Sequence, residues 1–333
     1  MIREENYTVR LSFFSDMDSE EKKNEGVVIR TTGSSYVVRR DDTTLVPCFI
    51  KGNFRIKGLK TTNPVAIGDR VHFREDGSDY ALIDKIFERK NYIIRRSTKL
   101  SKQTQIIAAN IDMAFLVVSA KLPKTDTAFI DRFLVTANAY NVPCQIVFNK
   151  IDIYDEEAMQ YAGYLIDIYE SIGYKCLLVS AQDKRGLDNL KKEMQGKITL
   201  FSGNSGVGKS TLINTICPSA TLKTGEVSSS HLSGKHTTTF AQMITEEDIN
   251  IIDTPGIKSF GMVDFKKEEL ALYFPEMKEK LEECKYYNCT HTHEPHCAIK
   301  EAVENEEISA ERYANYLKML ESDEMQLNEW ETE

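Results

Sequence analysis

The chain has 333 residues, which is enough for two or three domains, and its 41% of hydrophobic residues is ordinary for a globular protein. Its longest apolar runs, such as Met113–Val118, are far shorter than the roughly 20 residues that cross a bilayer, and its first residues lack a cationic start followed by an apolar core. These features argue against a membrane-spanning helix and a secretory signal, so we predict a cytoplasmic protein that binds no membrane.

The net charge of −9 is distributed unevenly along the chain. Residues 301–333 hold eleven acidic and two basic side chains, so residues 1–300 sum to zero. Within these, residues 26–105 hold sixteen Lys and Arg against eight Asp and Glu, a balance of +8. A locally basic module on an acidic protein is compatible with nucleic-acid binding, because the field of a phosphate is felt over a Debye length of about 8–10 Å.

After an N-terminal extension of 25 residues, the segment 26–95 predicts a small β-barrel. Short runs that mostly alternate apolar with polar or basic residues predict five strands, at residues 26–32, 34–40, 45–52, 69–75 and 80–89. Five strands in about 70 residues favour an OB-fold (oligonucleotide/oligosaccharide-binding) barrel, and an SH3-like barrel is the alternative. Aromatic Phe54 and Tyr80 fit RNA contact by stacking, although a charged barrel face can also be merely solvated.

A polar, basic linker follows at residues 96–110, and the pattern then changes to alternating strands and helices over residues 111–262. Mostly apolar runs that suit strands buried on both faces of a parallel sheet lie at residues 113–120, 144–150, 175–181, 198–203 and 249–256. Helices are predicted at residues 127–140 and 156–172. Because ligands bind at the carboxyl ends of such strands, the residues there are candidates for the chemistry: Asn149, Ser180, Gly203 and Asp253.

The stretch Gly203–Ser210 fits the phosphate-loop pattern GxxxxGKS between a strand and an apolar helix start. Its glycines let successive backbone N–H groups face phosphate oxygens, and the following helix adds its positive N-terminal end. We expect Lys209 to reach the β- and γ-phosphates and Ser210 to ligate Mg²⁺.

The stretch Asn149–Asp152, with the sequence NKID, selects the base. A carboxylate at Asp152 can accept both N1–H and the exocyclic amine of guanine, whereas adenine offers no such donor pair. We expect Asn149 to tie this base-reading loop to the phosphate loop and the stem of Lys150 to cover the ring. The next strand ends in Ser180 and Ala181, and the Ala181 amide is available to the base oxygen.

The stretch Asp253–Gly256, with the sequence DTPG, completes the nucleotide site. Asp253 is predicted to hold the magnesium shell and the Gly256 N–H to sense the γ-phosphate. A threonine before it completes this sensor, and we favour Thr238 over Thr237. The motifs therefore run NKxD, SA, phosphate loop, Thr, DxxG, a circular permutation of the order in ordinary regulatory GTPases.

Seven cysteines, three of them crowded with histidines into fourteen residues, argue against a disulfide framework. The scattered cysteines are expected to be small buried side chains: Cys48, Cys144, Cys176 and Cys217. The crowded group offers three thiolates and an imidazole, a set suited to one tetrahedral structural Zn²⁺, from Cys284, Cys289, His291 and Cys297. His293 and His296 are surplus in this interpretation.

Residues 263–333 predict a mostly helical zinc-binding domain that ends in an acidic tail. The last clear helix starts after Ser309, a plausible N-cap. An aromatic and aliphatic stripe on this helix is expected to pack onto the body of the protein, and it comprises Tyr313, Tyr316, Leu317 and Leu320.

The permuted motif order, the stretches GNSGVGKST, HTTT and DTPG, the preceding barrel and the following Cys/His cluster together resemble the bacterial RsgA (YjeQ) family of circularly permuted GTPases. The resemblance covers residues 26–320, and it implies a monomeric assembly factor that binds GTP or GDP with Mg²⁺, contacts the small ribosomal subunit and its 16S rRNA, and leaves on hydrolysis. The predicted GTP-binding residues are Asn149, Lys150, Ile151, Asp152, Ser180, Ala181, Gly203, Asn204, Ser205, Gly206, Val207, Gly208, Lys209, Ser210, Thr211, Asp253 and Gly256. The predicted magnesium ligands are Ser210, Thr238 and Asp253.

Hydrolysis is expected to be slow without a partner. The position after DxxG, where common GTPases carry a glutamine that orients the attacking water, is Ile257, which cannot hydrogen-bond water. Lys209, Thr238 and His236 are the predicted catalytic residues, and a structural or RNA-contacting role remains open for His236. Two other functional classes also remain open: a GTP-regulated signalling or transport-linked protein, and a non-hydrolysing RNA-binding scaffold.

Overall fold

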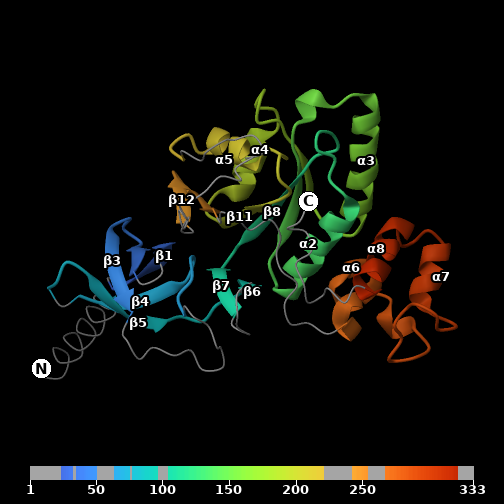
Figure 1. The fold of residues 1–333 in the computed structure, drawn as a ribbon, viewed down its shortest axis with the longest axis horizontal. Helices are drawn as coiled ribbons and strands as arrows, with labels where there is room; N and C mark the ends of the chain where they lie inside the picture. Colours follow the sequence, from blue (N-terminus) through green and yellow to red (C-terminus); the bar gives the residue numbers. More distant parts are fainter. Residues whose placement is uncertain are drawn as a thin grey trace, which may run out of the picture.

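The computed structural model describes residues 24–32, 35–50, 64–75, 77–96, 104–220, 242–253 and 267–321. Figure 1 shows an N-terminal barrel, a central sheet with helices on both faces, and a small helical domain against one of these helical layers. None of the helices within the described residues has the length and apolar character needed to cross a membrane.

The N-terminal module is a closed five-stranded barrel. Its strands are β1 (Glu25–Thr31), β2 (Ser35–Arg39), β3 (Leu45–Ile50), β4 (Arg70–Arg74) and β5 (Ala81–Ile86). β1 pairs antiparallel with both β2 and β4, and β3 pairs parallel with β5, which closes the barrel in the order 1-2-3-5-4. Alternate side chains such as Val28, Val38 and Phe73 fill the interior. The five predicted strands and the OB-type barrel are therefore confirmed.

The segment predicted to be a linker, residues 96–110, contains the second strand of a β-hairpin. Strands β6 (Tyr92–Arg96) and β7 (Thr104–Ala109) form a separate two-stranded antiparallel sheet. The buried side chains of Ile93 and Ile106 anchor it, and Ala108 bridges to Ile67 of the barrel module. The polar composition of residues 96–103 concealed this pairing, so residues 104–109 are a strand and not a linker.

The central sheet is mostly parallel. Its strands lie in the order β10 (Cys176–Leu178), β9 (Cys144–Phe148), β8 (Met113–Val118), β11 (Ile198–Ser202), β13 (Ile249–Asp253) and β12 (Gln242–Glu246). All neighbours pair parallel except β12, which pairs antiparallel with β13 and was not predicted from the sequence. β12 also touches β1 of the barrel through the pair Arg30 and Gln242, so the two modules share one continuous sheet.

Four helices cover the two faces of this sheet. Helices α2 (Thr127–Ala139) and α3 (Glu156–Ser171) lie on one face, and α4 (Leu187–Met194) and α5 (Lys209–Ile216) lie on the other (Figure 1). Successive residues of β8 serve the two layers, because Leu116 packs in the core with α2 and α3 whereas Val117 packs with α4 and α5. The side chains of Asp126 and Asp155 cap the first two helices.

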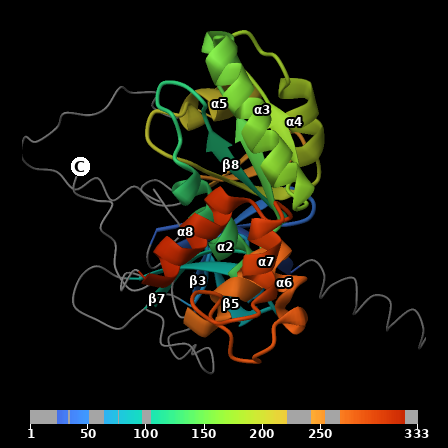
Figure 2. The same cartoon turned by 90° about the vertical axis from the view of Figure 1, so that its right-hand side faces the viewer.

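The C-terminal domain packs against α2 and α3, as the view in Figure 2 makes clear. It comprises a 3₁₀ segment (Lys267–Tyr273), α6 (Pro275–Lys278), a second 3₁₀ turn (Leu281–Glu283), α7 (Ala298–Glu304) and α8 (Ala310–Glu321). The predicted stripe on α8 packs into the core of this domain around Phe274 and Ile299. The Ser309 hydroxyl accepts a 3.5 Å hydrogen bond from the Arg312 N–H, consistent with the predicted cap.

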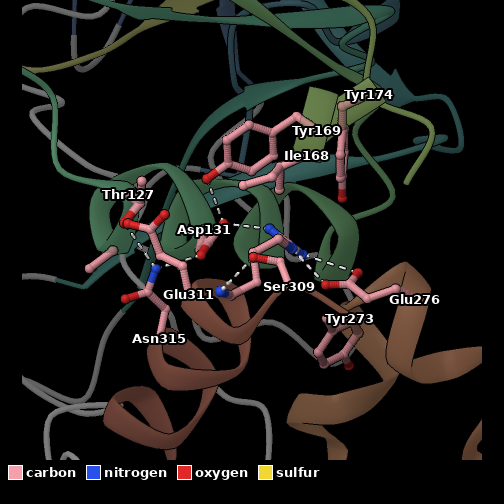
Figure 3. A network of polar contacts seen from close by, with 12 residues as sticks. Thr127, Asp131, Ile168, Tyr169, Tyr174, Tyr273, Glu276, Ser309, Glu311 and Asn315 are labelled. Atoms are coloured by element: carbon pink, nitrogen blue, oxygen red, sulfur yellow. Dashed lines mark hydrogen bonds and ion pairs between the residues drawn. The ribbon is translucent and has the colours of Figure 1, made fainter. Parts of the chain in front are cut away.

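A buried ionic network joins the C-terminal domain to α2 (Figure 3). The guanidinium of Arg312, 2% exposed, donates to Asp131 of α2 and to Glu276 of α6, at 2.6 Å for the Nε to Glu276 contact. Asp131 also accepts from Asn315 at 2.7 Å and from the Tyr169 hydroxyl at 2.9 Å. Burial raises the pKa of Asp131, while Arg312 opposes that rise. The negative charges of Asp131 and Glu276 are therefore both balanced by the guanidinium of Arg312.

We expect Arg312→Met to lower the free energy of unfolding by about 3–5 kcal/mol, because it leaves two buried carboxylates without their cation. Urea denaturation of the zinc-loaded protein measures the change. Lys280→Met is the matched control, since the Lys280 to Glu307 pair lies at the surface and its loss should change the free energy of unfolding far less. Equal losses in the two variants would show that the buried network adds nothing beyond a surface pair.

Candidate functional site

The phosphate loop lies between β11 and α5, and two of its glycines are required by close backbone approaches. Gly203 has φ +146°, and a Cβ there would lie 2.2 Å from the Val117 carbonyl oxygen. Gly208 has φ +95°, and a Cβ there would lie 2.5 Å from the Asn149 side-chain nitrogen. A side chain at either position would displace the backbone of the loop or the base-reading motif.

Lys209 begins α5 and its ammonium turns back over the loop. Its Nζ donates to the carbonyl oxygens of Gly203 and, at 2.7 Å, of Asn204. Burial lowers the pKa of Lys209 to about 8. An anion placed beside this ammonium would favour its charged form, as a nucleotide phosphate does. The loop thus has the curled backbone, the helix N-terminus and the cation of a phosphate site.

Asn149 connects the base-reading motif to the phosphate loop. It directly follows β9, is 1% exposed, and its side-chain amide donates to the Val207 carbonyl oxygen at 2.9 Å. Its side-chain oxygen accepts from the Ala181 N–H at 3.4 Å. One amide therefore holds three motifs together, and the tie predicted from the sequence is present.

Asp152 lies in a 3₁₀ turn (Ile151–Ile153) and is exposed to an incoming base. Its Oδ1 accepts a 2.7 Å hydrogen bond from the hydroxyl of Ser180, which is itself fully buried. The same hydroxyl accepts from the backbone of Gln182 and Asp183, at 3.2 Å each. Ser180 thus fixes the orientation of the Asp152 carboxylate, a contact that sequence reasoning missed because it had singled out the neighbouring Ala181 amide.

Lys150 crosses from the base-reading motif toward the phosphate loop. It adopts the left-handed conformation with φ +67°, and its Cε would lie 3.6 Å from a Cβ built on Gly208. Its Nζ donates to the Leu122 carbonyl oxygen at 2.7 Å, a contact that the sequence did not predict. The Lys150 side chain therefore lies between the base-reading motif and the phosphate loop.

The structure brings most of the predicted nucleotide residues together. Asp253 ends β13, whose neighbour β11 leads into the phosphate loop, so its backbone lies at the same edge of the sheet. Further predicted residues lie outside the described part of the chain: His236, Thr237, Thr238, Gly256 and Ile257.

The four predicted zinc ligands form one compact cluster. The donor atoms of Cys284, Cys289, His291 and Cys297 all lie within 4.8 Å of one another. His291 is 3% exposed, and its Nδ1 lies 3.6 Å from the Cys284 sulfur and 3.5 Å from the Cys297 sulfur. Three sulfurs and one imidazole at this spacing fit a closed tetrahedral Zn²⁺ site. His293 and His296, in contrast, are exposed.

Two tyrosines of helix α8 hydrogen-bond to the backbone beside this cluster. The hydroxyls of Tyr313 and Tyr316 donate to the carbonyl oxygens of His291 and Thr290, at 2.6 and 2.9 Å. Although burial opposes it, hydrogen bonds from Thr290 and Thr292 hold the pKa of Glu294 well below its usual range. The metal-binding segment is therefore shaped by polar contacts on two sides as well as by its thiolates.

Comparison with known proteins identifies the family of this chain. A family model described as RsgA N-terminal domain matches residues 25–83, and one described as RsgA GTPase matches residues 86–263. The chain belongs to the RsgA family. A family member from Bacteroides thetaiotaomicron, named small ribosomal subunit biogenesis GTPase RsgA 2, is 55% identical over 301 residues, which are 90% of this chain and 97% of that protein. The family member from Flavobacterium johnsoniae is 52% identical over 303 residues, 90% of this chain and 93% of its own.

Solved structures of the RsgA family agree with this fold. YjeQ from Thermotoga maritima superposes with a TM-score of 0.73 at 35% identity, covering 89% of this chain and 97% of that one. YloQ, described as a circularly permuted GTPase, superposes with a TM-score of 0.71 at 32% identity, covering 89% and 93%. The fold is therefore shared over 89% of this chain, as the RsgA resemblance predicted.

Replacing the selecting carboxylate should change the base preference. We expect Asp152→Asn to weaken GTP binding by about 100-fold, because the charge and one acceptor are lost and the new N–H faces a guanine N–H. It should improve binding of xanthosine triphosphate, whose 2-oxo group accepts from the new amide. Competition of unlabelled nucleotides against a fluorescent GDP measures both effects. Asp188→Asn, an exposed change on α4, is the control and should leave both affinities as they are. An unaltered GTP affinity in Asp152→Asn would remove this residue from base recognition.

The two histidines near the last cysteine provide a paired test of the metal site. We expect His291→Ala to lose most of the bound zinc and to lower the melting temperature, whereas His296→Ala keeps about one zinc per chain, since its side chain is exposed and lies outside the cluster. Metal analysis of gel-filtered protein measures the content. Loss of zinc from the His296 variant alone would reverse the ligand assignment.

Proposed function

We propose that this chain hydrolyses GTP to GDP and phosphate as a late assembly factor of the small ribosomal subunit, and that hydrolysis releases it from the subunit. The observation that carries the proposal is the Asn149 bridge, which ties the motif containing Asp152 to the phosphate loop. The two relatives that align with 90% of the chain are named small ribosomal subunit biogenesis GTPases.

In this proposal the nucleotide is held at both ends by the predicted GTP-binding residues. Asp152 accepts from guanine, the stem of Lys150 covers the ring, and Lys209 contacts the β- and γ-phosphates. Mg²⁺ is held by oxygen ligands from Ser210, Thr238 and Asp253, the hard donors this ion prefers. When bound, the ion neutralises charge that develops on the phosphates.

The zinc is structural in this proposal. The cluster of Cys284, Cys289, His291 and Cys297 leaves no open coordination position for a substrate once a tetrahedral ion is bound. Its contribution is to hold a segment that is too small to build a core of its own.

The barrel offers the chemistry that 16S rRNA requires. Phe49 and Tyr80 are exposed on its surface, with ring centroids 4.8 Å apart in an edge-to-face arrangement. The surrounding segment carries the basic excess of +8 found over residues 26–105. Aromatic rings provide stacking for unpaired bases and the basic side chains attract the phosphates, so this face supports RNA contact. Phe54, the other predicted aromatic, lies outside the described residues.

Turnover is proposed to be slow until the small subunit binds. Ile257 cannot orient a water, and His236 is the proposed substitute. Such a factor works where ribosomes are assembled, so we place it in the cytoplasm as a monomer in its free state.

Phosphate release measured with and without purified small subunits tests this function. We expect weak multiple-turnover hydrolysis by the chain alone and a strong increase with subunits. Lys209→Ala should abolish both activities, because the γ-phosphate loses its cation, whereas His236→Ala should bind GTP normally and lose most of the stimulation.

The outcomes separate the competing functions. Stimulation that is unaltered in His236→Ala would remove this histidine from the mechanism. Absence of multiple turnover under both conditions would favour an RNA-binding scaffold that uses GTP only for structure. A rate of phosphate release that is the same with and without subunits, together with no salt-dependent association with them, would favour a signalling protein.

A further inference from the structure

The loop between β8 and α2 touches both halves of the nucleotide site, although none of the nucleotide motifs includes it. This segment, residues 119–125, is here termed the bracket loop. Its two ends are closed on each other, because the Ser119 N–H donates to the Thr125 hydroxyl at 3.0 Å and the Thr125 N–H donates to the Ser119 carbonyl at 2.8 Å. Both residues are 2% exposed. The bracket loop is therefore a fixed element of the structure.

Two contacts place the bracket loop against the motifs. The Leu122 carbonyl oxygen accepts the 2.7 Å hydrogen bond from Lys150 of the base-reading motif. The ring of Pro123 lies against the phosphate loop, since a Cβ built on Gly206 would be 3.6 Å from its Cδ. Displacing the bracket loop would thus disturb the base end and the phosphate end together.

A third contact comes from Tyr154, two residues after the guanine-selecting Asp152. Its hydroxyl accepts from the Ala120 N–H of the bracket loop at 2.7 Å and donates to the Asn149 carbonyl oxygen at 3.0 Å. The Asn149 backbone that it holds carries the amide that reaches Val207 and Ala181. Burial raises the pKa of Tyr154, so the hydroxyl keeps its proton at neutral pH and can donate.

We propose that Tyr154 is a positioning residue for guanine recognition, whose hydroxyl clamps the base-reading motif to the bracket loop. This inference rests on the proposed GTP-binding function and extends it, because it assigns the placement of the NKxD backbone at Asn149 to a side chain outside the motif. Without the hydroxyl, the Asn149 carbonyl and the Ala120 N–H lose a shared partner in a largely buried place, and the motif shifts relative to the phosphate loop.

Tyr154→Phe in the full-length, zinc-loaded chain tests the proposal, since it removes the hydroxyl and keeps the ring. We expect the dissociation constant for GDP to rise about three- to tenfold. Inosine diphosphate lacks the 2-amino group and makes one hydrogen bond fewer to Asp152, so its affinity should fall less, and the preference for GDP over it should shrink at least about twofold. The kcat at saturating GTP should stay as in the wild type, with the loss confined to KM.

The matched control is Tyr164→Phe, which removes a phenol hydroxyl of α3 that contacts Glu311 of α8 at 3.5 Å, on the side facing the C-terminal domain. It should leave both nucleotide affinities unaltered. The ratio of the two affinities does not depend on the folded fraction, so it stays informative if Tyr154→Phe lowers the stability.

A Tyr154→Phe variant with the wild-type ratio, whatever its melting temperature, would overturn the positioning role, as would a fall in kcat at unaltered KM. Failure of the proposed function looks different. If the wild-type chain binds ADP as tightly as GDP, guanine recognition itself is wrong, whereas a guanine-selective wild type with an unaffected variant rejects only the role of Tyr154.

Discussion

The nucleotide site depends on one buried amide. Asn149 spans 58 positions of sequence to reach the carbonyl of Val207, and it simultaneously receives the N–H of Ala181. Because it is 1% exposed, an unpaired amide here would carry the full cost of desolvation, so the three loops are fixed relative to one another. The permuted chain order has no effect on this geometry, since parallel strands bring their carboxyl ends to the same edge whichever loop connects them.

Sequence reasoning recovered the parts of the molecule whose chemistry is local. The phosphate loop, the NKxD motif and the metal ligands each lie within a short stretch, and their spacing alone specifies a cradle, a carboxylate and a tetrahedral donor set. It failed where strand pairing depends on partners that are remote in the sequence. Strand β12 and the strand of residues 104–109 carry short, mixed polar runs, and only their neighbours make them strands.

Buried charged residues were also not predicted from the sequence. An arginine in an amphipathic helix is normally read as a surface residue, yet Arg312 is buried because Asp131 lies opposite it from 181 positions earlier in the chain. Tyr154 and the bond from Ser180 to Asp152 were missed for the same reason, although Ser180 itself was predicted as a site residue, since a hydroxyl acquires its role from partners that the sequence does not place. Local motifs thus predict the ligands of a site better than they predict what aligns them.

The Arg312 network restricts how the C-terminal domain can respond to the nucleotide. This domain follows β13 and the DTPG stretch in the chain, so a γ-phosphate sensor at that stretch, as the sequence predicts, would act directly on the domain after hydrolysis. Yet sliding it over α2 would strip a guanidinium from its carboxylates, at a cost of about 3–5 kcal/mol, a large share of the stability of a typical domain. A motion that carries α2 along with the domain would keep these ion pairs. It would act on the short connection from β8 to α2, whose Leu122 carbonyl accepts a hydrogen bond from Lys150 of the base-reading motif.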